Sequence, residues 1–116
     1  MTDGPVPRRG EVWDADLGLR AGSEQEGVRP VLVISSDRFN AMRNRLCIVV
    51  ALTRTDRNLR IHVRIQPPEG GLDGPSVVQC EQVRAISYDR LRHRRGAVRP
   101  TTLRLVADRL RDLQDL

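Results

Sequence analysis

The sequence contains no lysine, although it carries 20 basic residues against 15 acidic ones. All of its basic side chains other than histidine are therefore arginines, and its formal net charge is +5. Arginine presents a planar fork of donors that matches phosphate geometry better than an ammonium group does. A genome rich in G and C also favours arginine, so the missing lysine is not by itself a sign of selection. The positive balance still indicates a polyanionic partner, most commonly nucleic acid.

Aromatic side chains are also scarce, since Trp13, Phe39 and Tyr88 are the only three. Three scattered aromatics exclude a base-stacking platform like that of an RNA recognition motif. The longest unbroken apolar run, which contains Cys47–Leu52, is far short of the roughly 20 residues of a membrane span. Residues 1–7 contain no apolar core of a signal peptide. We therefore expect a disordered N-terminal tail over 1–7 and a cytoplasmic protein without a membrane anchor.

Cysteine is limited to Cys47 and Cys80, both in apolar surroundings typical of strands. The pair has neither CxxC spacing nor a neighbouring histidine, so the sequence offers no recognisable metal site. We expect two reduced, buried thiols, with no metal and no cofactor.

The length of 116 residues allows one domain, which we place at 8–116. Residues 10–17 alternate as a half-buried strand does. Residues 31–34 and 47–52 are apolar on both faces, which is typical of central strands. Further strands are expected over 76–86, as one or two pieces, and over 96–98. Loops are expected over 18–27 and 66–75, and a helical turn over 88–91.

Residues 60–65 alternate as Arg-Ile-His-Val-Arg-Ile, so we expect a strand with its three aliphatic side chains inward. This alternation places His62 on the exposed face. The other histidine, His93, lies within the basic cluster 90–95. We interpret both histidines as solvated or facing phosphate rather than catalytic.

Two segments have helical spacing. Residues 37–45 carry Phe39 and Met42 on one side, and Ser35, Ser36 and Asp37 are available as caps. A longer amphipathic helix follows Pro100. Its apolar stripe comprises Leu103, Val106, Ala107, Leu110 and Leu113, and the expected ion pairs are Arg104–Asp108 and Arg111–Asp115.

Strands dominate the chain, with helices mainly at its end, so the fold class is α+β. We expect a small, mostly antiparallel β-barrel or sheet with a short helix after the second strand. The C-terminal amphipathic helix would cover the sheet, or else form a helix–helix dimer contact.

The junction of a charged loop and an apolar strand occurs at Arg29. Pro30 fixes its own φ and pushes the preceding residue toward extended geometry, so the backbone of Arg29 is restrained. A restrained arginine is a good phosphate clamp. The alternative is a surface arginine that merely precedes an edge strand.

Five segments together resemble the MazF/PemK family of toxin endoribonucleases, whose SH3-like fold also covers the CcdB gyrase poisons. The resemblance runs over almost all of 8–114. The segments are Arg8-Arg9-Gly10-Glu11-Val12-Trp13 with Asp16-Leu17, Gly22-Ser23-Glu24-Gln25 with Arg29-Pro30-Val31, Ser36-Asp37 with Asn40, Val50-Ala51-Leu52-Thr53, and Glu81-Gln82-Val83-Arg84 with Ile86. Each segment alone is weak, but their order and spacing form a specific signal.

This resemblance implies a toxin of a type II toxin–antitoxin system that inhibits translation and growth. Family members cut single-stranded RNA sequence-selectively and without a metal, by attack of a 2′-hydroxyl that leaves a cyclic phosphate and a 5′-hydroxyl. Arg29 matches the catalytic arginine, and Thr53 the hydroxyl that bonds the scissile phosphate. An arginine, with a pKa above about 12, is a stabiliser of charge and a poor base. Glu24 could be the proton acceptor, or only a brace of its loop.

The resemblance also implies an RNA groove at the interface of a homodimer, for which an acidic antitoxin segment would compete. Candidate RNA-binding residues are Gln25, Arg54, Arg57, Gln79, Glu81 and Arg84. Glu81 and Arg84 could orient the substrate or simply pair with each other. The basic cluster 90–95, with Arg54, Arg57, Arg60 and Arg64, could form an electrostatic track for the RNA backbone.

The sequence departs from the plasmid PemK/Kid branch, which carries histidine where Ser23 stands, arginine where Gln79 stands and aspartate where Glu81 stands. We therefore do not expect a histidine-assisted mechanism. Two other functions stay open, a CcdB-like gyrase poison and a noncatalytic nucleic-acid-binding module. The chain ends Asp-Leu-Gln-Asp-Leu, without the tryptophan or glycine-rich terminus expected of a gyrase poison. The constellation of Arg29, Thr53 and the Glu-Gln-x-Arg segment favours the nuclease.

Overall fold

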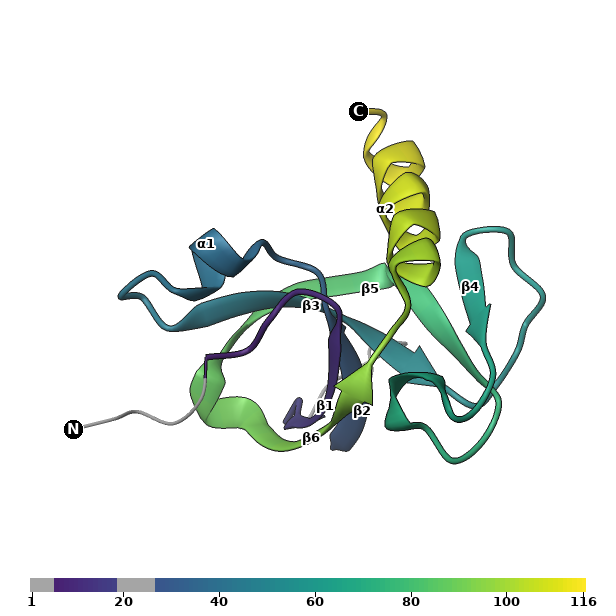
Figure 1. Ribbon diagram of the computed structural model, residues 1–116. Coiled ribbons are helices and arrows are strands. Elements are labelled where there is room, and N and C mark those ends of the chain that lie inside the picture. Colours follow the sequence, from purple (N-terminus) through teal and green to yellow (C-terminus); the bar gives the residue numbers. More distant parts are fainter. Residues whose placement is uncertain (1–5, 19–26) are drawn as a thin grey trace.

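The computed structural model of the chain describes residues 6–18 and 27–116 (Figure 1). The elements follow one another as β1 (Glu11–Asp16), β2 (Val28–Val33), α1 (Asp37–Asn40), β3 (Leu46–Thr53), β4 (His62–Ile65), η1 (Glu69–Gly71), β5 (Ser76–Ser87), η2 (Tyr88–Arg90), β6 (Leu91–Ala97) and α2 (Pro100–Gln114), where η denotes a 3₁₀ turn. Within those two ranges, no helix has the length and apolar character needed to span a bilayer.

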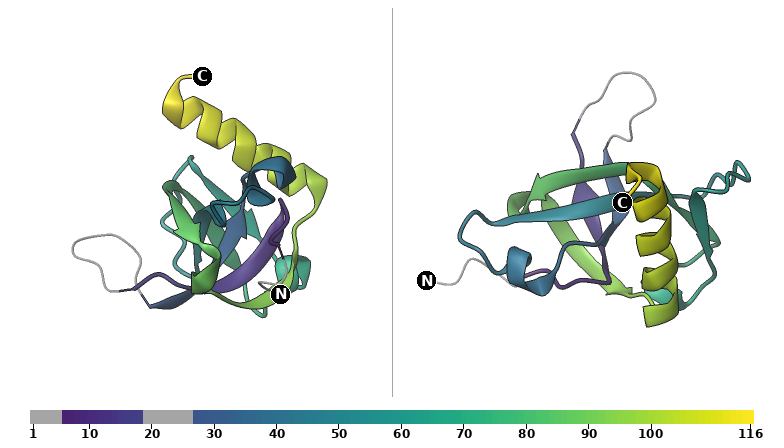
Figure 2. Two further views of the ribbon diagram at one scale, coloured as in Figure 1. Left: turned by 90° about the vertical axis from the view of Figure 1, so that its left-hand side faces the viewer. Right: turned by 90° about the horizontal axis from the view of Figure 1, so that it is seen from above.

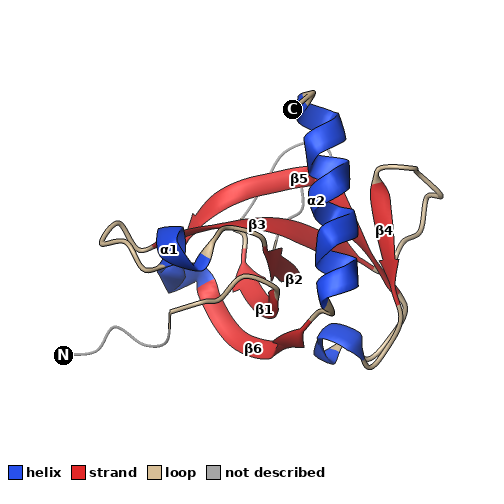
Figure 3. Cartoon of the chain, turned by 45° about the horizontal axis from the view of Figure 1, so that its top comes forward, coloured by secondary structure: helices blue, strands red, loops and turns tan. Residues whose placement is uncertain are grey.

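The six strands form one sheet in the order β4-β5-β3-β2-β1-β6, and each neighbouring pair is antiparallel. β4 and β6 are the edges, so the sheet is strongly curled but open (Figure 3). Register shifts in the β1–β6 and β3–β5 ladders fit this curvature, because bulges increase strand bending and twist. The predicted mostly antiparallel architecture is confirmed. Of the two predicted forms, a barrel or a sheet, the structure has the open sheet.

Both faces of the central strands are buried, as the two apolar runs predicted. Along β2, Val31 and Val33 belong to one apolar cluster, whereas Leu32 belongs to another on the opposite face. β3 alternates in the same way. One cluster centres on Trp13, Val31, Val33, Val49 and Ile86, and the other on Val12, Leu32, Val50, Leu52, Val78 and Ile65. Burial on both sides fixes the register, because a slip by one residue would exchange the two faces.

α2 crosses one face of the sheet (Figure 2), where Val106 and Leu110 pack into the second cluster. Its first turn is anchored by Glu69, whose Oε2 accepts a hydrogen bond from the backbone N–H of Arg99 at 2.9 Å. The predicted stripe is confirmed at its centre, but Leu113 is 43% exposed. The helix carries an ion pair between Arg111 and Asp108, at 3.4 Å, instead of the two predicted pairs.

α1 is shorter than the predicted helix over 37–45. Ser36 caps it by accepting a hydrogen bond from the N–H of Phe39 at 3.1 Å. The helix ends at Asn40, whose buried side chain bonds the backbone oxygen of Ser35 at 3.2 Å. Met42 is exposed, so no apolar packing extends the helix beyond this point.

β6 is longer than the predicted strand over 96–98 and includes most of the basic cluster. It pairs with β1, whose carboxylates meet its arginines across the ladder. The ion pairs are Arg92–Asp16 at 3.3 Å, Arg94–Glu11 at 2.7 Å and Arg95–Asp14 at 2.7 Å. Acidic residues of β1 therefore neutralise a strand that was identified only as a basic cluster in the sequence.

The predicted loop over 66–75 contains the short turn η1, which touches β6 backbone to backbone. A Cβ on Gly71 would lie 2.0 Å from the carbonyl oxygen of Arg95, and a Cβ on Gly96 would lie 2.8 Å from the nitrogen of Gly71. Only glycine fits at such separations. This contact sets the position of Arg95 relative to the loop that follows η1.

Candidate active site

Arg29 and Thr53 converge at one end of the sheet. In the β2–β3 ladder Val31 pairs with Ala51, and continuing that register by two residues places Thr53 opposite Arg29. Both residues line a single hollow of about 200 Å³, together with Pro30, Leu52, Arg54, Leu72, Asp73, Ser76 and Arg95. The guanidinium and the alcohol singled out from the sequence are therefore positioned to share one ligand.

The hollow is positively charged. Three arginines line it, Arg29, Arg54 and Arg95, against the single carboxylate of Asp73. Arg54 is ion-paired with Asp73, and the Nε of Arg95 donates to Asp14 at 2.7 Å. The hydrogen bond to Asp14 raises the pKa of Arg95 and outweighs the opposing effect of burial. The net positive charge suits an anion, and a phosphodiester fits that chemistry.

The hydroxyl of Thr53 is arranged to donate. Its Oγ1 accepts a hydrogen bond from the backbone N–H of Thr55 at 3.2 Å. A hydroxyl has two acceptor lone pairs and one donor hydrogen, so this bond leaves the O–H available. Thr53 is partly exposed at the end of β3, which gives a ligand in the hollow access to it.

Two predicted site residues, Glu24 and Gln25, lie outside the described residues. The two ends of their segment are joined by backbone hydrogen bonds. The N–H of Gly27 donates to the oxygen of Gly18, and the N–H of Leu17 donates to the oxygen of Gly27, both at 2.9 Å.

The exposed position predicted for His62 is wrong. Its side chain is 2% exposed, and its Nε2 lies 2.9 and 3.1 Å from the two carboxylate oxygens of Glu81. His62 pairs with Gln79 in the β4–β5 ladder, so β5 covers the histidine with its own polar side chains. Alternation within one strand could not reveal which neighbouring strand would cover that face.

The remaining predicted RNA-binding residues are dispersed over β5 and the loop before β4. Glu81 pairs with His62 rather than with Arg84, and an Nη1 of Arg84 donates to the backbone oxygen of Leu17 at 3.4 Å. Gln79 is buried, with 4% of its surface exposed. Arg54 lines the hollow and Arg57 is exposed.

The sequence did not place Leu72, Asp73, Ser76 or Arg95 in this site. They come from the loop after η1, the start of β5 and the edge strand β6. Only the fold brings these separate segments to the ends of β2 and β3. The Asp-Gly-Pro turn at 73–75 marked a chain reversal but carried no sign of proximity to Arg29.

The two cysteines are unsuited to nucleophilic chemistry. Both are buried free thiols, as predicted. Burial raises the pKa of Cys47 to about 11, and burial followed by the nearby Glu81 charge raises that of Cys80 to about 11. Among the described residues, no three histidine, cysteine, aspartate or glutamate side chains gather as a metal site would require.

Comparison with known sequences identifies the family. Residues 8–113 match the family model of PemK-like, MazF-like toxins of type II toxin–antitoxin systems. The chain is 41% identical over 88 residues to the endoribonuclease EndoA of Bacillus subtilis strain 168, covering 74% of this chain and 75% of that protein. It is 39% identical over 89 residues to the endoribonuclease MazF of Staphylococcus saprophyticus, covering 75% and 73%.

Solved structures share the fold. The crystal structure of MazF from Deinococcus radiodurans superposes with a TM-score of 0.85 at 24% identity, covering 97% of this chain and all of that one. An endoribonuclease in complex with its cognate antitoxin, from Mycobacterial species, gives a TM-score of 0.79 at 27% identity, covering 95% and 96%. Given the convergence of Arg29 and Thr53 and the extent of these matches, the chain belongs to the PemK-like, MazF-like toxin family of type II toxin–antitoxin systems.

Proposed function

We propose that this endoribonuclease toxin, a single domain over 8–116, acts in the cytoplasm and cleaves single-stranded RNA in the hollow between the ends of β2 and β3. The main support for this proposal is that Arg29 and Thr53 line the same positively charged hollow. Sequence-selective cleavage of cellular RNA by this route would inhibit translation and growth.

The reaction is an internal displacement at phosphorus that does not call for a metal. The ribose 2′-oxygen bonds to the adjacent phosphorus, and the bond from phosphorus to the 5′-oxygen breaks. A proton leaves the attacking hydroxyl, and another reaches the departing oxygen. The products carry a 2′,3′-cyclic phosphate and a free 5′-hydroxyl. The enzyme must therefore stabilise extra negative charge on the phosphate and manage two protons.

Arg29 supplies the charge stabilisation in this scheme. Its guanidinium stays positive throughout and can donate two parallel hydrogen bonds to the phosphate oxygens. Thr53 donates its hydroxyl hydrogen to the same phosphate while the N–H of Thr55 holds its oxygen in place. Pro30 restrains the backbone of Arg29, which reduces the ordering needed when RNA binds.

We assign the proton acceptor to a carboxylate, because carboxylates can act as a base at neutral pH whereas arginine cannot. Glu24 follows from the family resemblance. Asp73 is a second candidate on structural grounds, since it lines the hollow beside Arg54. Comparing Glu24→Gln with Asp73→Asn decides between them: the variant that loses the base shows a fall in kcat and loses the acid limb of the pH–rate profile.

RNA binding is assigned to Gln25, Arg54, Arg57, Gln79, Glu81 and Arg84 as well as to the catalytic hollow. Arg54, Arg57 and Glu81 are exposed. Glu81 is held by His62, which would orient it toward a bound base as an acceptor. Gln79 and Arg84 are less exposed, and their contribution would be to fix the neighbouring side chains.

We further propose a homodimer and a cognate antitoxin as partners. The antitoxin is supported by the mycobacterial structure described as a complex with its cognate antitoxin. The homodimer follows from the family resemblance. Light scattering of the purified protein at several concentrations tests the homodimer.

The direct test is cleavage of a mixed RNA pool by the purified protein in the presence of EDTA. We expect discrete cuts at a short recurring sequence, with cyclic phosphate and 5′-hydroxyl ends. Arg29→Ala and Thr53→Ala should abolish the cuts while the circular dichroism spectrum is unchanged. Intact RNA together with inhibition of DNA gyrase would instead identify a gyrase poison, and binding of RNA without any cut would identify a noncatalytic module.

A further inference from the structure

Three hollows follow one another along the surface from the catalytic hollow to α2. The catalytic hollow shares Arg54 and Ser76 with a small hollow of about 50 Å³. That small hollow shares Arg64 with a third one of about 430 Å³. Residues shared by successive hollows place the three hollows next to one another on the surface.

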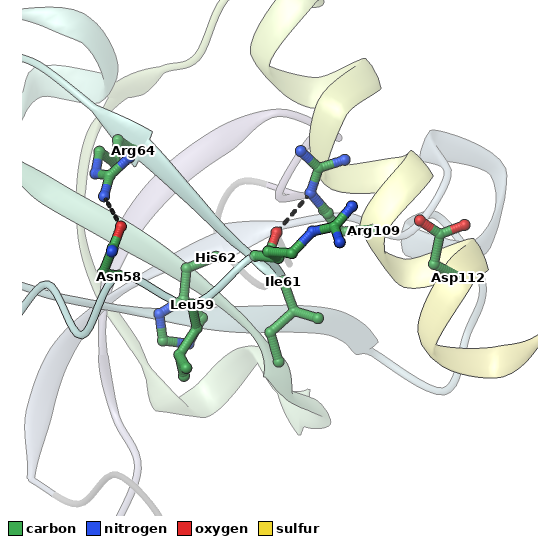
Figure 4. Close-up of a pocket in the computed structure, with 8 residues that line it drawn as sticks. Asn58, Leu59, Ile61, His62, Arg64, Arg109 and Asp112 are labelled. Carbon is green, nitrogen blue, oxygen red and sulfur yellow. Dashed lines mark hydrogen bonds between the residues drawn. The ribbon is translucent and has the colours of Figure 1, made fainter.

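The third hollow lies between the segment before β4, β4 itself and α2 (Figure 4). Its lining comprises Asn58, Leu59, Arg60, Ile61, His62, Arg64, Arg109 and Asp112. Arg109 and Asp112 reach it from α2. Three guanidiniums thus surround this hollow against one carboxylate.

Two of these guanidiniums have donors to spare. Within the described part of the chain, the side chain of Arg60 has no hydrogen-bond or ion-pair partner. The Nε of Arg109 donates to the backbone oxygen of Arg60 at 2.8 Å, which fixes the stem of the side chain and leaves its terminal nitrogens for a ligand. Arg64 is committed to Asp56 and Asn58, at 2.6 and 2.7 Å.

The arginines of β6 differ from Arg60 and Arg109 in their ion pairing. Arg92, Arg94 and Arg95 are each ion-paired with a carboxylate of β1. A phosphate binding there would have to compete with those carboxylates, whereas Arg60 and Arg109 offer unpaired donors among the described residues. Along the path formed by the three hollows, Arg54 and Arg64 are paired with Asp73 and Asp56, so the unpaired donors of the described path lie at its far end beside α2.

We propose that the Arg60–Arg109 hollow is a distal phosphate subsite, which binds the backbone of the RNA strand some nucleotides away from the cut. This inference rests on the proposed function. Arg60 and Arg109 contact a phosphate, and Leu59 and Ile61 provide an apolar wall against which a sugar or base can pack. The subsite makes longer RNAs better substrates without taking part in the chemistry.

RNA is the occupant that the observations favour, because the hollow continues the path that starts at Arg29 and Thr53. An acidic protein segment could bind to the positive charges of this hollow alone, so its binding would not explain why the hollow lies next in line to the catalytic one. The experiment therefore measures both occupants.

The test first maps the cut site, and then compares a short RNA spanning it with RNAs extended on the 5′ side only or on the 3′ side only. In the unsubstituted protein we expect one of the two extensions to raise kcat/KM. Arg60→Ala and Arg109→Ala should each reduce that gain by about 10-fold, the usual size of a charge-assisted phosphate contact. Each should also flatten the dependence of RNA affinity on salt by about 0.7 in log–log slope.

Arg104→Ala is the matched control, because Arg104 is an exposed arginine on the same helix that lines none of the three hollows. It removes the same charge and should keep the full length gain. Arg109→Gln retains a donor toward the Arg60 carbonyl, so it separates loss of the charge from loss of the α2 contact. Thermal unfolding of each variant verifies the fold.

The outcomes separate the two proposals. If the unsubstituted protein cleaves no RNA, the proposed function itself is wrong. Normal cleavage with an undiminished length gain in Arg60→Ala and Arg109→Ala overturns the distal subsite alone. Binding of an oligoglutamate peptide that depends on Arg109, with no such dependence for RNA, also overturns it and assigns the hollow to an acidic protein segment.

Discussion

The arginines of β6 and those in and beyond the catalytic hollow carry the same charge, but only the second group includes side chains without a carboxylate partner among the described residues. On β6, Arg92, Arg94 and Arg95 each face a carboxylate of β1. In the second group Arg54 pairs with Asp73, but Arg57 and Arg60 in the loop beyond the hollow are exposed and have no carboxylate within ion-pair distance among the described residues. The first group holds an edge strand onto the sheet, and the second is available to a polyanion.

The comparison shows that a count of basic residues does not locate a nucleic-acid surface. The sequence cluster 90–95 is the densest basic stretch of the chain, yet β1 neutralises much of it. Sparser arginines, brought together by the ends of β2 and β3 and by α2, make the stronger candidate surface. Arg95 belongs to both groups, since it pairs with Asp14 and also lines the catalytic hollow.

The largest effect that separates the groups is expected from Arg29→Ala. Removing the guanidinium from the hollow should lower kcat for RNA cleavage by about 1,000-fold, because the phosphate loses its main charge stabilisation. Arg94→Ala, on β6, removes the same charge and should retain most of the activity. Single-turnover cleavage of one labelled RNA measures both, and equal losses in the two variants would erase the distinction between the groups.

Thr53→Ala comes next, with an expected loss of about 100-fold in kcat, since one donor to the phosphate disappears. Thr53→Ser retains the hydroxyl and should restore most of the rate. A serine variant as slow as the alanine variant would show that the side chain acts through packing at the end of β3 and not through its hydrogen bond.

For stability, the order of the two groups should be reversed, with the larger loss on substitution at the β1–β6 edge. Asp14→Ala leaves Arg95 partly buried without its partner, and we expect a loss of about 1–2 kcal/mol in the free energy of unfolding. Asp73→Ala breaks an exposed ion pair with Arg54 and should cost no more than about 0.5 kcal/mol. Urea unfolding of the two variants gives the comparison, and similar losses would mean that the β1–β6 pairs do not hold the strand.

The smallest effect concerns the acid stability of the same edge. Burial alone would raise the pKa of Glu11, but hydrogen bonds from the Arg8 N–H, Trp13 Nε1 and Arg94 outweigh it, so the pKa lies below its ordinary 4.5. A carboxylate of this kind stabilises the fold at neutral pH and loses that contribution as the pH falls below 4.5 through its folded pKa. Glu11→Gln should therefore be less stable at neutral pH and should lose less stability on acidification. Urea midpoints across this range provide the measurement, and parallel curves for both proteins would contradict the assignment.

Local patterns predicted the central part of the fold because their causes are local. The apolar runs at 31–34 and 47–52 identified the two central strands, and the Arg29-Pro30 junction lies at the end of one of them. Continuous apolar sequence has no alternative to burial on both faces. The family resemblance then linked Arg29 with Thr53, and the hollow brings the two residues together.

The failures share a nonlocal cause. His62 is buried because β5 brings Glu81 against it, and the turn η1 separates the two strands in the chain. β6 extends over the basic cluster because β1 supplies Glu11, Asp14 and Asp16 as partners. Neither strand carries a sign of its future neighbour. Asp73 and Arg95 were missed as members of the hollow for the same reason.

The contact between Gly71 and Gly96 makes activity vulnerable far from the reacting phosphate. Any side chain at Gly71 would push against the main chain at Arg95, and one at Gly96 would push against Gly71. Either change would separate η1 from β6 and displace Arg95, which lines the catalytic hollow. A genetic selection for inactive versions of this protein should therefore recover replacements of these two glycines alongside lesions at Arg29 and Thr53.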